Sequence, residues 1–124
     1  MKALVYAGLL ALMATGYGQA QDYPTKQVTI ITPGTPGSTS DLMPRVIADE
    51  LTPRLGKPVV VENRSGGSGL VSANSALGQP ADGHTLWFGT MGTTTINPFV
   101  MDDMPFDSLK AWTPIAEAGS MPLV

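Results

Sequence analysis

Residues 28–55 read VTIITPGTPGSTSDLMPRVIADELTPRL, and they decide the expected fold. The run 28–32 is short, apolar and rich in β-branched side chains, which is typical of a buried strand. A loop of small and polar residues follows over 33–40. The next apolar side chains recur at the spacing of one helix face, at Leu42, Val46, Ile47, Leu51 and Leu55. The stretch therefore predicts a strand, a loop and an amphipathic helix, in that order.

The ends of this helix carry their own signals. Asp41 is a good N-cap, because its side chain can accept a hydrogen bond from a free N–H group of the first turn. Pro44 would then stand at the third helical position, where its missing N–H costs nothing. Pro53 is expected to kink or break the helix near its end, and Gly56 to close it.

The pattern of strands and helices continues along the chain. A second strand is expected at 59–61, followed by a glycine-rich turn at 65–69 and a weaker helix over 70–77. A third strand is expected over 85–88, and 112–118 is a candidate fourth strand. This order predicts an α/β fold built on a βαβαβ unit, with a parallel sheet because its crossovers are right-handed. The first strand should lie between the second and the third.

Two loops of small polar residues, 33–41 and 89–97, follow the first and third strands. In parallel sheets ligands bind at the carboxyl ends of the strands where the crossover direction reverses, which is here between those two strands. The loops offer backbone N–H groups, hydroxyls and the amide of Asn97, without any Lys or Arg. The first loop also runs into a helix N-terminus, with its partial positive charge. These groups suit an anionic oxygen, such as a carboxylate, held by neutral donors.

The residues needed for catalysis are scarce. The chain has no Cys and one His, His84, so thiolate chemistry is excluded and a zinc site or a Ser–His–Asp triad lacks partners. Neither loop contains a general base, unless Asp41 is spared its capping role. Gly34 and Gly37 are out of frame for a dinucleotide fingerprint, and no Gly-Lys-Ser/Thr closes the first loop. We therefore predict no catalytic residue, metal or cofactor, and binding without turnover.

The charge balance argues against a nucleic-acid partner. Seven Lys and Arg stand against ten Asp and Glu, which gives a formal net charge of −3. A nucleic-acid binder needs a basic stripe that displaces counterions from phosphates. After Arg64 the only basic residue is Lys110, so no nucleic acid is expected among the partners.

Residues 1–20 read MKALVYAGLLALMATGYGQA and have the features of a secretory signal peptide. One Lys precedes an apolar run of about 13 residues, which is shorter than the roughly 20 needed to cross a bilayer. Small residues stand at the −3 and −1 positions of a cut before Gln21. We expect 1–20 to be removed and 21–124 to be exported.

Several motifs resemble the Bug family, the periplasmic solute-binding receptors of tripartite tricarboxylate transporters. The residues that carry this resemblance are YPTK at 23–26, LGKPVVVENR at 55–64, GGSG at 66–69, PADGHTL at 80–86 and the run 92–98. The resemblance spans nearly all of residues 23–124. Departures occur at three positions, because the family usually has an aromatic residue at Gly34, a glycine at Ser38 and a tyrosine at His84. The identity of the ligand is therefore not carried over.

The resemblance implies a type II periplasmic-binding-protein-like fold, in which two α/β domains close on the ligand. Residues 21–124 would be the N-terminal part of the first domain, incomplete and without the second. The implied ligand is a small organic carboxylate, the implied partners are membrane permease subunits, and the implied location is the periplasm. The ligand-facing positions would be Thr35, Ser38, Thr39, Asp41, Thr90, Gly92, Thr93 and Asn97, with Gly66 and Gly67 as weaker candidates.

Two other functions stay open at this point. A periplasmic sensor would use the same receptor fold to feed a signalling system instead of a permease. A secreted serine hydrolase would use Ser68 or Ser38, and it would require a base such as His84 beside the nucleophile.

Overall fold

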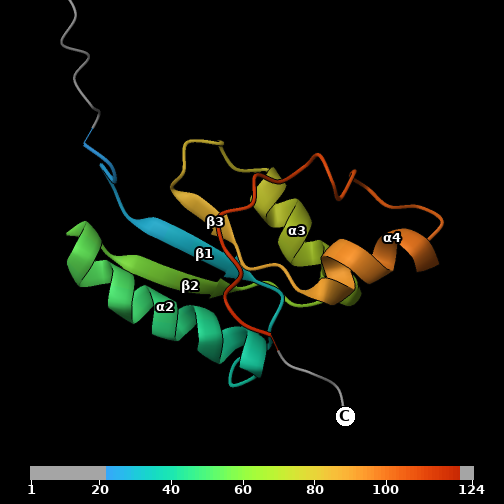
Figure 1. The fold of residues 1–124 in the computed structure, drawn as a ribbon, viewed down its shortest axis with the longest axis horizontal. Coiled ribbons are helices and arrows are strands. Elements are labelled where there is room, and N and C mark those ends of the chain that lie inside the picture. Colours follow the sequence, from blue (N-terminus) through green and yellow to red (C-terminus); the bar gives the residue numbers. More distant parts are fainter. Residues whose placement is uncertain (1–21, 121–124) are drawn as a thin grey trace, which may run out of the picture.

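The computed structural model describes residues 22–120, so the predicted signal peptide lies outside the described residues. Within them the chain forms a small parallel sheet with helices packed around it (Figure 1). The elements in chain order are β1 (Val28–Thr32), α2 (Thr39–Leu55), β2 (Val59–Asn63), η1 (Gly67–Gly69), α3 (Leu70–Leu77), β3 (Thr85–Trp87), η2 (Gly92–Ile96) and α4 (Asn97–Val100).

The sheet has the predicted topology. Its strand order is β2-β1-β3, and both pairs are parallel. Val28 is paired with Val59, and Thr29 with Thr85. The first strand is therefore central, as expected, and α2 and α3 lie on opposite sides of the sheet (Figure 1). Two right-handed crossovers in opposite directions, from β1 to β2 and then from β2 past β1 to β3, produce this arrangement.

The core lies between α2 and the sheet. Val28, Ile30, Ala48 and Val59 are buried there, and partly buried apolar side chains of α2 and the sheet surround them. The helix periodicity is confirmed in part, because Ile47, Leu51 and Leu55 pack against this core. Leu42 and Val46, from the same pattern, stay 54% and 64% exposed. In the first turns of α2 the buried positions are Asp41 and Pro44 instead.

The N-terminal end of α2 differs from the prediction. The helix begins at Thr39 with Ser38 in the N-cap position, so Asp41 lies inside the first turn and the prediction of Asp41 as N-cap is wrong. Pro44 consequently lies deeper in the helix than the third position. Its missing N–H leaves the carbonyl of Ser40 without its usual helical donor, and the hydroxyl of Thr32 donates to that carbonyl instead.

The C-terminal end of α2 agrees better with the sequence. The helix passes through Pro53 without a break and ends at Leu55. Gly56 closes it in the left-handed conformation, with φ of 65°, and its N–H donates to the carbonyl of Thr52. The expected role of Gly56 is confirmed, whereas the expected break at Pro53 is not found.

The predicted fourth strand is wrong. Residues 112–118 are irregular and form no strand. Pro114 has no N–H to donate to a ladder, and Trp112 instead stacks on Trp87 with ring centroids 4.1 Å apart. Within residues 22–120, β3 is therefore an edge strand, and the side that faces away from β1 pairs with no further strand.

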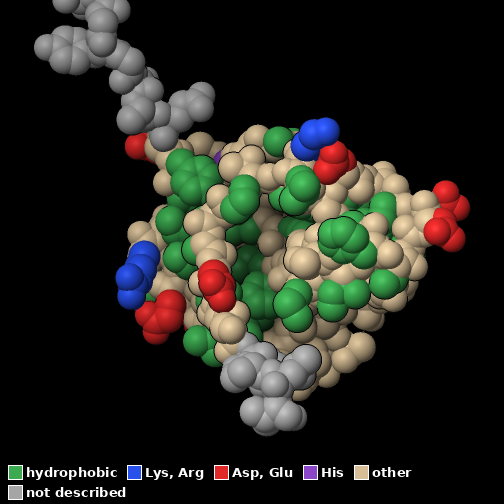
Figure 2. Space-filling model, turned by 45° about the vertical axis from the view of Figure 1, so that its right-hand side comes forward, with side chains coloured by type: hydrophobic (Ala, Val, Ile, Leu, Met, Phe, Trp, Pro, Cys, Tyr) green, Lys and Arg blue, Asp and Glu red, His purple; other side chains and the backbone are tan. Residues whose placement is uncertain are grey.

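Several apolar side chains in the C-terminal half of the chain are strongly exposed. Phe99, Val100, Leu109 and Ile115 are between 69% and 92% exposed. Figure 2 shows a hollowed face with hydrophobic side chains in and around the hollow, an acidic side chain beside it, and further charged side chains nearer the outline of the molecule. Within the described part of the chain, no helix is both long enough and apolar enough to span a membrane.

Candidate functional site

The carboxyl ends of the three strands form one edge of the sheet, from here on the carboxyl edge (Figure 1). Backbone hydrogen bonds mark it: Arg64 N–H donates to the Thr32 carbonyl at 2.9 Å, and Phe88 N–H to the Ile31 carbonyl at 2.8 Å. The loops that begin after Thr32 and after Phe88 therefore leave the sheet side by side. The two loops singled out from the sequence start at the same edge.

Hydrogen bonds to the side chain of Asp41, which is only 3% exposed, hold the conformation of the first loop. Its Oδ2 accepts a hydrogen bond from Gly37 N–H, and its Oδ1 accepts from Arg45 Nε and Asn63 Nδ2, each at 2.8 Å. Asn63 also donates to the carbonyl of Gly34 at 2.9 Å. The Arg45 hydrogen bond, followed by those from Gly37 and Asn63, holds the pKa of Asp41 well below its usual range. The carboxylate is therefore ionised and already occupied by donors.

Gly34 lies where this loop folds back onto the start of α2. A Cβ at Gly34 would lie 2.7 Å from the Ser40 carbonyl carbon and 2.8 Å from the Asp41 nitrogen. A larger side chain at this position requires a different loop path. The Oγ of Ser38 is buried and has no hydrogen-bond partner among the described residues. Thr35 and Thr39 are exposed at the surface of the loop.

The second loop is largely helical, which the sequence did not indicate. Gly92–Ile96 is a π-helical turn, in which Asn97 N–H donates to the carbonyl of Gly92, five residues earlier. Such turns are rare and often occur at functional sites. Thr93 and Asn97 are buried, at 1% and 6% exposure, whereas Thr90 and Gly92 are half-buried. The hydroxyls of Thr90 and Thr93 lie 3.2 Å apart.

A third segment, residues 65–69, completes the edge. The carbonyl of Ser68 accepts hydrogen bonds from Thr93 Oγ1 at 3.2 Å and from Asn97 Nδ2 at 3.0 Å. Gly69 lies so close to Thr93 that a Cβ there would collide with Oγ1. This 65–69 loop therefore packs against η2. The family resemblance names Gly66 and Gly67 of this loop only as weaker candidates.

Three loops thus leave the sheet at the carboxyl edge. Asn63 is bonded to the first loop, and Ser68 is bonded to the helix that replaces the second. The nearby cations are paired with carboxylates, Arg45 with Asp41 and Arg64 with Glu62. Hydroxyls and backbone N–H groups are left as the free donors. Residues 22–120 contain no group of three or more His, Asp or Glu side chains that could hold a metal ion.

His84 lies at the other end of the sheet. It directly precedes β3, where its Nε2 accepts a hydrogen bond from Thr25 N–H at 3.2 Å and its ring contacts that of Tyr23. Ser38 and Ser68 belong to loops at the carboxyl edge. The pairing of His84 with either serine, which the hydrolase alternative required, is not formed.

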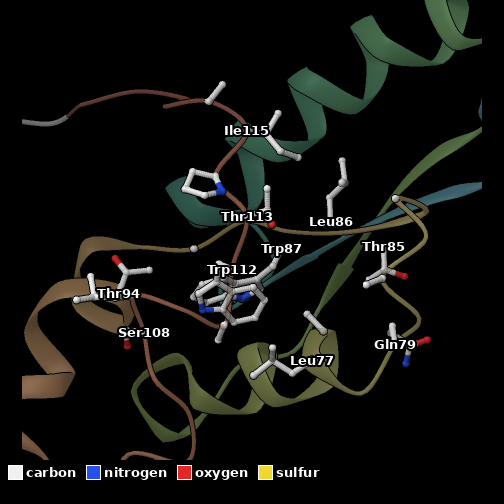
Figure 3. A pocket seen from close by; sticks show the side chains of 18 of the residues that line it. Leu77, Gln79, Thr85, Leu86, Trp87, Thr94, Ser108, Trp112, Thr113 and Ile115 are labelled. Carbon is white, nitrogen blue, oxygen red and sulfur yellow. The ribbon is translucent and has the colours of Figure 1, made fainter.

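A cleft of about 760 Å³ runs along the open edge of β3 (Figure 3). Its lining is mainly apolar and includes Leu86, Trp87, Trp112 and Ile115. None of the eight predicted ligand-facing residues lines it, and of the second loop it touches only Gly89 and Thr94. Apolar walls do not suit a carboxylate, so we place the candidate site at the carboxyl edge and not in this cleft.

Comparisons with known proteins agree with this fold. Residues 43–124 match the model of the tripartite tricarboxylate transporter family receptor. Protein BugT of Bordetella pertussis is 34% identical over 106 residues, which are 85% of this chain and 32% of that protein. The chain therefore spans about a third of the length of this relative.

Two solved structures are similar to the described fold. One is R. palustris Rpa4515 with adipate, with a TM-score of 0.67 and 40% identity, covering 70% of this chain and 29% of that one. The other is a periplasmic transporter, with a TM-score of 0.68 and 36% identity over 71% of this chain and 30% of that one. Together with the family match over residues 43–124, these similarities place the chain in the tripartite tricarboxylate transporter receptor family.

Proposed function

We propose that this chain is the N-terminal part of an exported receptor that captures a small organic carboxylate and delivers it to membrane permease subunits. The periplasm is the proposed location, since a signal peptide fits residues 1–20 and one similar structure is a periplasmic transporter. The adipate in the Rpa4515 structure supports a carboxylate as the ligand class.

One observation carries the proposal, the convergence of three loops rich in neutral donors at the carboxyl edge. The N-terminus of α2 starts there at Thr39 and adds the positive end of a 17-residue helix. Exposed and half-buried residues that carry hydroxyl or backbone N–H groups come from both predicted loops. We propose as ligand-facing positions Thr35, Ser38 and Thr39 in the first loop, and Thr90 and Gly92 in the second.

The three buried members of the predicted site have a different environment. The side chains of Asp41, Thr93 and Asn97 are each engaged by neighbouring protein groups. They support the surrounding loops in this proposal. No base is free at the edge, because the carboxylate of Asp41 accepts three hydrogen bonds, so the proposed role is binding without chemistry.

The test is a titration of the purified chain with adipate, followed by amide chemical shifts. The chain spans about a third of the length of BugT, so it can supply only part of the contacts of such a receptor. We therefore expect weak binding, with a dissociation constant on the order of 1 mM. The shifts should concentrate at residues 34–39, 66–69 and 90–92. Hexane-1,6-diol has the same chain length without charge and is the matched control, which should produce no such shifts.

Two results would contradict the proposal. Adipate shifts confined to the apolar cleft beside Trp87 and Trp112 would move the site away from the carboxyl edge. Equal responses to adipate and to the diol would show that the carboxylates are not recognised.

A further inference from the structure

We propose that Thr93 and Asn97 are positioning residues, which hold the 65–69 loop in a shape that presents its N–H groups to the carboxylate. This inference rests on the proposed function and assigns these two side chains a role other than ligand contact. It also makes the 65–69 loop a third wall of the site.

The first argument is the convergence of two donors on one acceptor. Thr93 Oγ1 and Asn97 Nδ2 both donate to the carbonyl of Ser68, at 3.2 and 3.0 Å. The hydroxyl hydrogen of Thr93 is thereby used, so the contact of 3.2 Å between Thr90 and Thr93 has Thr90 as the donor. Both positioning side chains are buried, which leaves them little surface for a ligand.

A second set of hydrogen bonds holds the next carbonyl of the loop, that of Gly69. Ser72 Oγ donates to the carbonyl of Gly69 at 2.8 Å, and Trp87 Nε1 donates to Ser72 Oγ at 3.0 Å. Ser72 is fully buried. Side chains from η2, α4, α3 and β3 therefore fix two consecutive carbonyls of the loop from the inside of the molecule.

The backbone conformation of the loop shows why these hydrogen bonds are needed. Gly66, Gly67, Ser68 and Gly69 all have positive φ, at 125°, 54°, 53° and 91°. Glycine adopts this conformation freely, but a residue with a Cβ such as Ser68 rarely does so. The conformation at Ser68 thus depends on contacts from outside the loop, and its carbonyl receives two of them.

The same hydrogen bonds determine which backbone groups of the loop face the solvent. The carbonyls of Ser68 and Gly69 are turned inward, and the carbonyl of Gly66 accepts from Gly69 N–H at 3.0 Å. The N–H groups of Gly67 and Ser68 have no hydrogen-bond partner within residues 22–120, and both residues are exposed. Two free donors therefore lie in the loop that follows β2 at the carboxyl edge, where a carboxylate oxygen could accept from them.

The experiment compares Thr93→Val, which keeps the shape and removes the hydroxyl, with Thr93→Ser, which keeps the hydroxyl. Thr95→Val is the matched control, because Thr95 is exposed and has no bond to the 65–69 loop among the described contacts. Amide spectra recorded without ligand report the conformation of the 65–69 loop. A titration with adipate measures the binding affinity, and thermal unfolding shows whether each variant keeps its stability. Asn97→Leu repeats the test at the second donor.

If Thr93 positions the loop, Thr93→Val moves the ligand-free amide signals of Gly67, Ser68 and Gly69 and weakens adipate binding about fivefold. Thr93→Ser restores both, and Thr95→Val changes neither. Reduced affinity with unmoved loop signals would mean that Thr93 contacts the ligand directly, and this would overturn the inference. Unmoved signals with unchanged affinity would overturn it as well.

The ligand-free spectra also separate the two proposals. If the parent chain binds no adipate, the proposed function fails, whereas moved loop signals in Thr93→Val still uphold the positioning role. If Thr93→Val does not fold, Asn97→Leu supplies the comparison, because Asn97 is the second donor to the Ser68 carbonyl. Loop signals that stay in place in Asn97→Leu would then contradict the inference.

Discussion

The side-chain amide of Asn63 donates to the carboxylate of Asp41 across 2.8 Å and joins the end of β2 to the first turn of α2. The two residues are 22 positions apart in the chain. Because Asn63 also holds the Gly34 carbonyl, this contact ties the first loop to its neighbouring strand. The shape of the carboxyl edge thus depends on a polar network and not on loop residues alone.

We predict that Asp41→Asn lowers stability in a pH-dependent way. The pKa of Asp41 is lowered in the folded chain, chiefly by the hydrogen bond from Arg45. A lowered pKa means that the carboxylate stabilises the fold above its ordinary value of 3.8, and that this contribution fades as the pH falls below it. Urea unfolding should therefore separate Asp41→Asn from the parent chain most at pH 7 and by a smaller margin at pH 3, because the contribution has only begun to fade there.

Asp102→Asn, at an exposed carboxylate, is the control and should follow the parent chain at both values of pH. Asp82 also has a pKa lowered to about 2, first by the His84 backbone N–H and then by Lys26. Asp82 is unaltered in each variant, so its contribution cancels in the comparison. A constant difference between Asp41→Asn and the parent chain from pH 7 to pH 3 would contradict the assigned cause.

The roles of Asp41 and Asn63 show where sequence-based prediction stopped. The β-branched run Val28–Thr32 gave a strand, and right-handed crossovers gave its central place, because both follow from local pattern and chirality. Asp41 was predicted as a cap from its position before an apolar run. Its actual partners include Asn63, and a contact between residues so far apart leaves no local pattern.

We predict that Gly34→Ala destabilises the first loop. Its new Cβ would lie within 2.8 Å of backbone atoms of Ser40 and Asp41, so the loop must shift. Overpacking of this kind costs about 1–3 kcal/mol, measured as the free energy of unfolding in urea. Gly78→Ala is the control, because a Cβ there meets its neighbours at 3.5 Å or more and should change stability by about 0.5 kcal/mol at most. Equal losses in the two variants would refute the close approach at Gly34.

The helical turn after β3 was missed for a related reason. Gly92–Ile96 contains a glycine and three threonines, which are poor helix formers, so the local sequence favours a loop. The bonds from Thr93 and Asn97 to Ser68 supply a tertiary reason for the helix. The prediction of a strand over 112–118 is the opposite case, because here an element was expected and is not formed. The apolar pattern of a strand is present, but Pro114 has no N–H to donate to a ladder.

We predict that the ring of Trp112, and not its N–H group, stabilises the apolar cleft. The ring stacks on Trp87 at 4.1 Å and meets Phe106 edge-on at 5.7 Å, whereas Nε1 is buried with no partner among the described residues. Trp112→Phe keeps an aromatic ring and removes the unpaired donor, so it should stay within about 1 kcal/mol of the parent chain. Trp112→Ala removes the stack and should cost about 2–3 kcal/mol.

Thermal or urea unfolding measures both Trp112 variants, and Trp87 fluorescence reports the cleft, since the chain has only 2 Trp. Acrylamide should quench Trp87 more strongly in Trp112→Ala than in Trp112→Phe. Leu109→Ala, at a side chain that is 92% exposed, should leave both stability and quenching unchanged. If Trp112→Phe were as destabilised as Trp112→Ala, the indole N–H would have to be bonded.

The contact between Gly69 and Thr93 predicts a coupling that a double-mutant cycle can measure. Gly69→Ala introduces a Cβ at a φ of 91° and against Thr93 Oγ1, so it carries both backbone strain and a clash. Thr93→Ala removes the clashing hydroxyl and leaves the strain unchanged. Gly69→Ala should therefore cost about 1–2 kcal/mol less in the Thr93→Ala background than in the parent chain. Additive effects would mean that the 65–69 loop and η2 are not in contact in solution, because strain at Gly69 alone does not depend on residue 93.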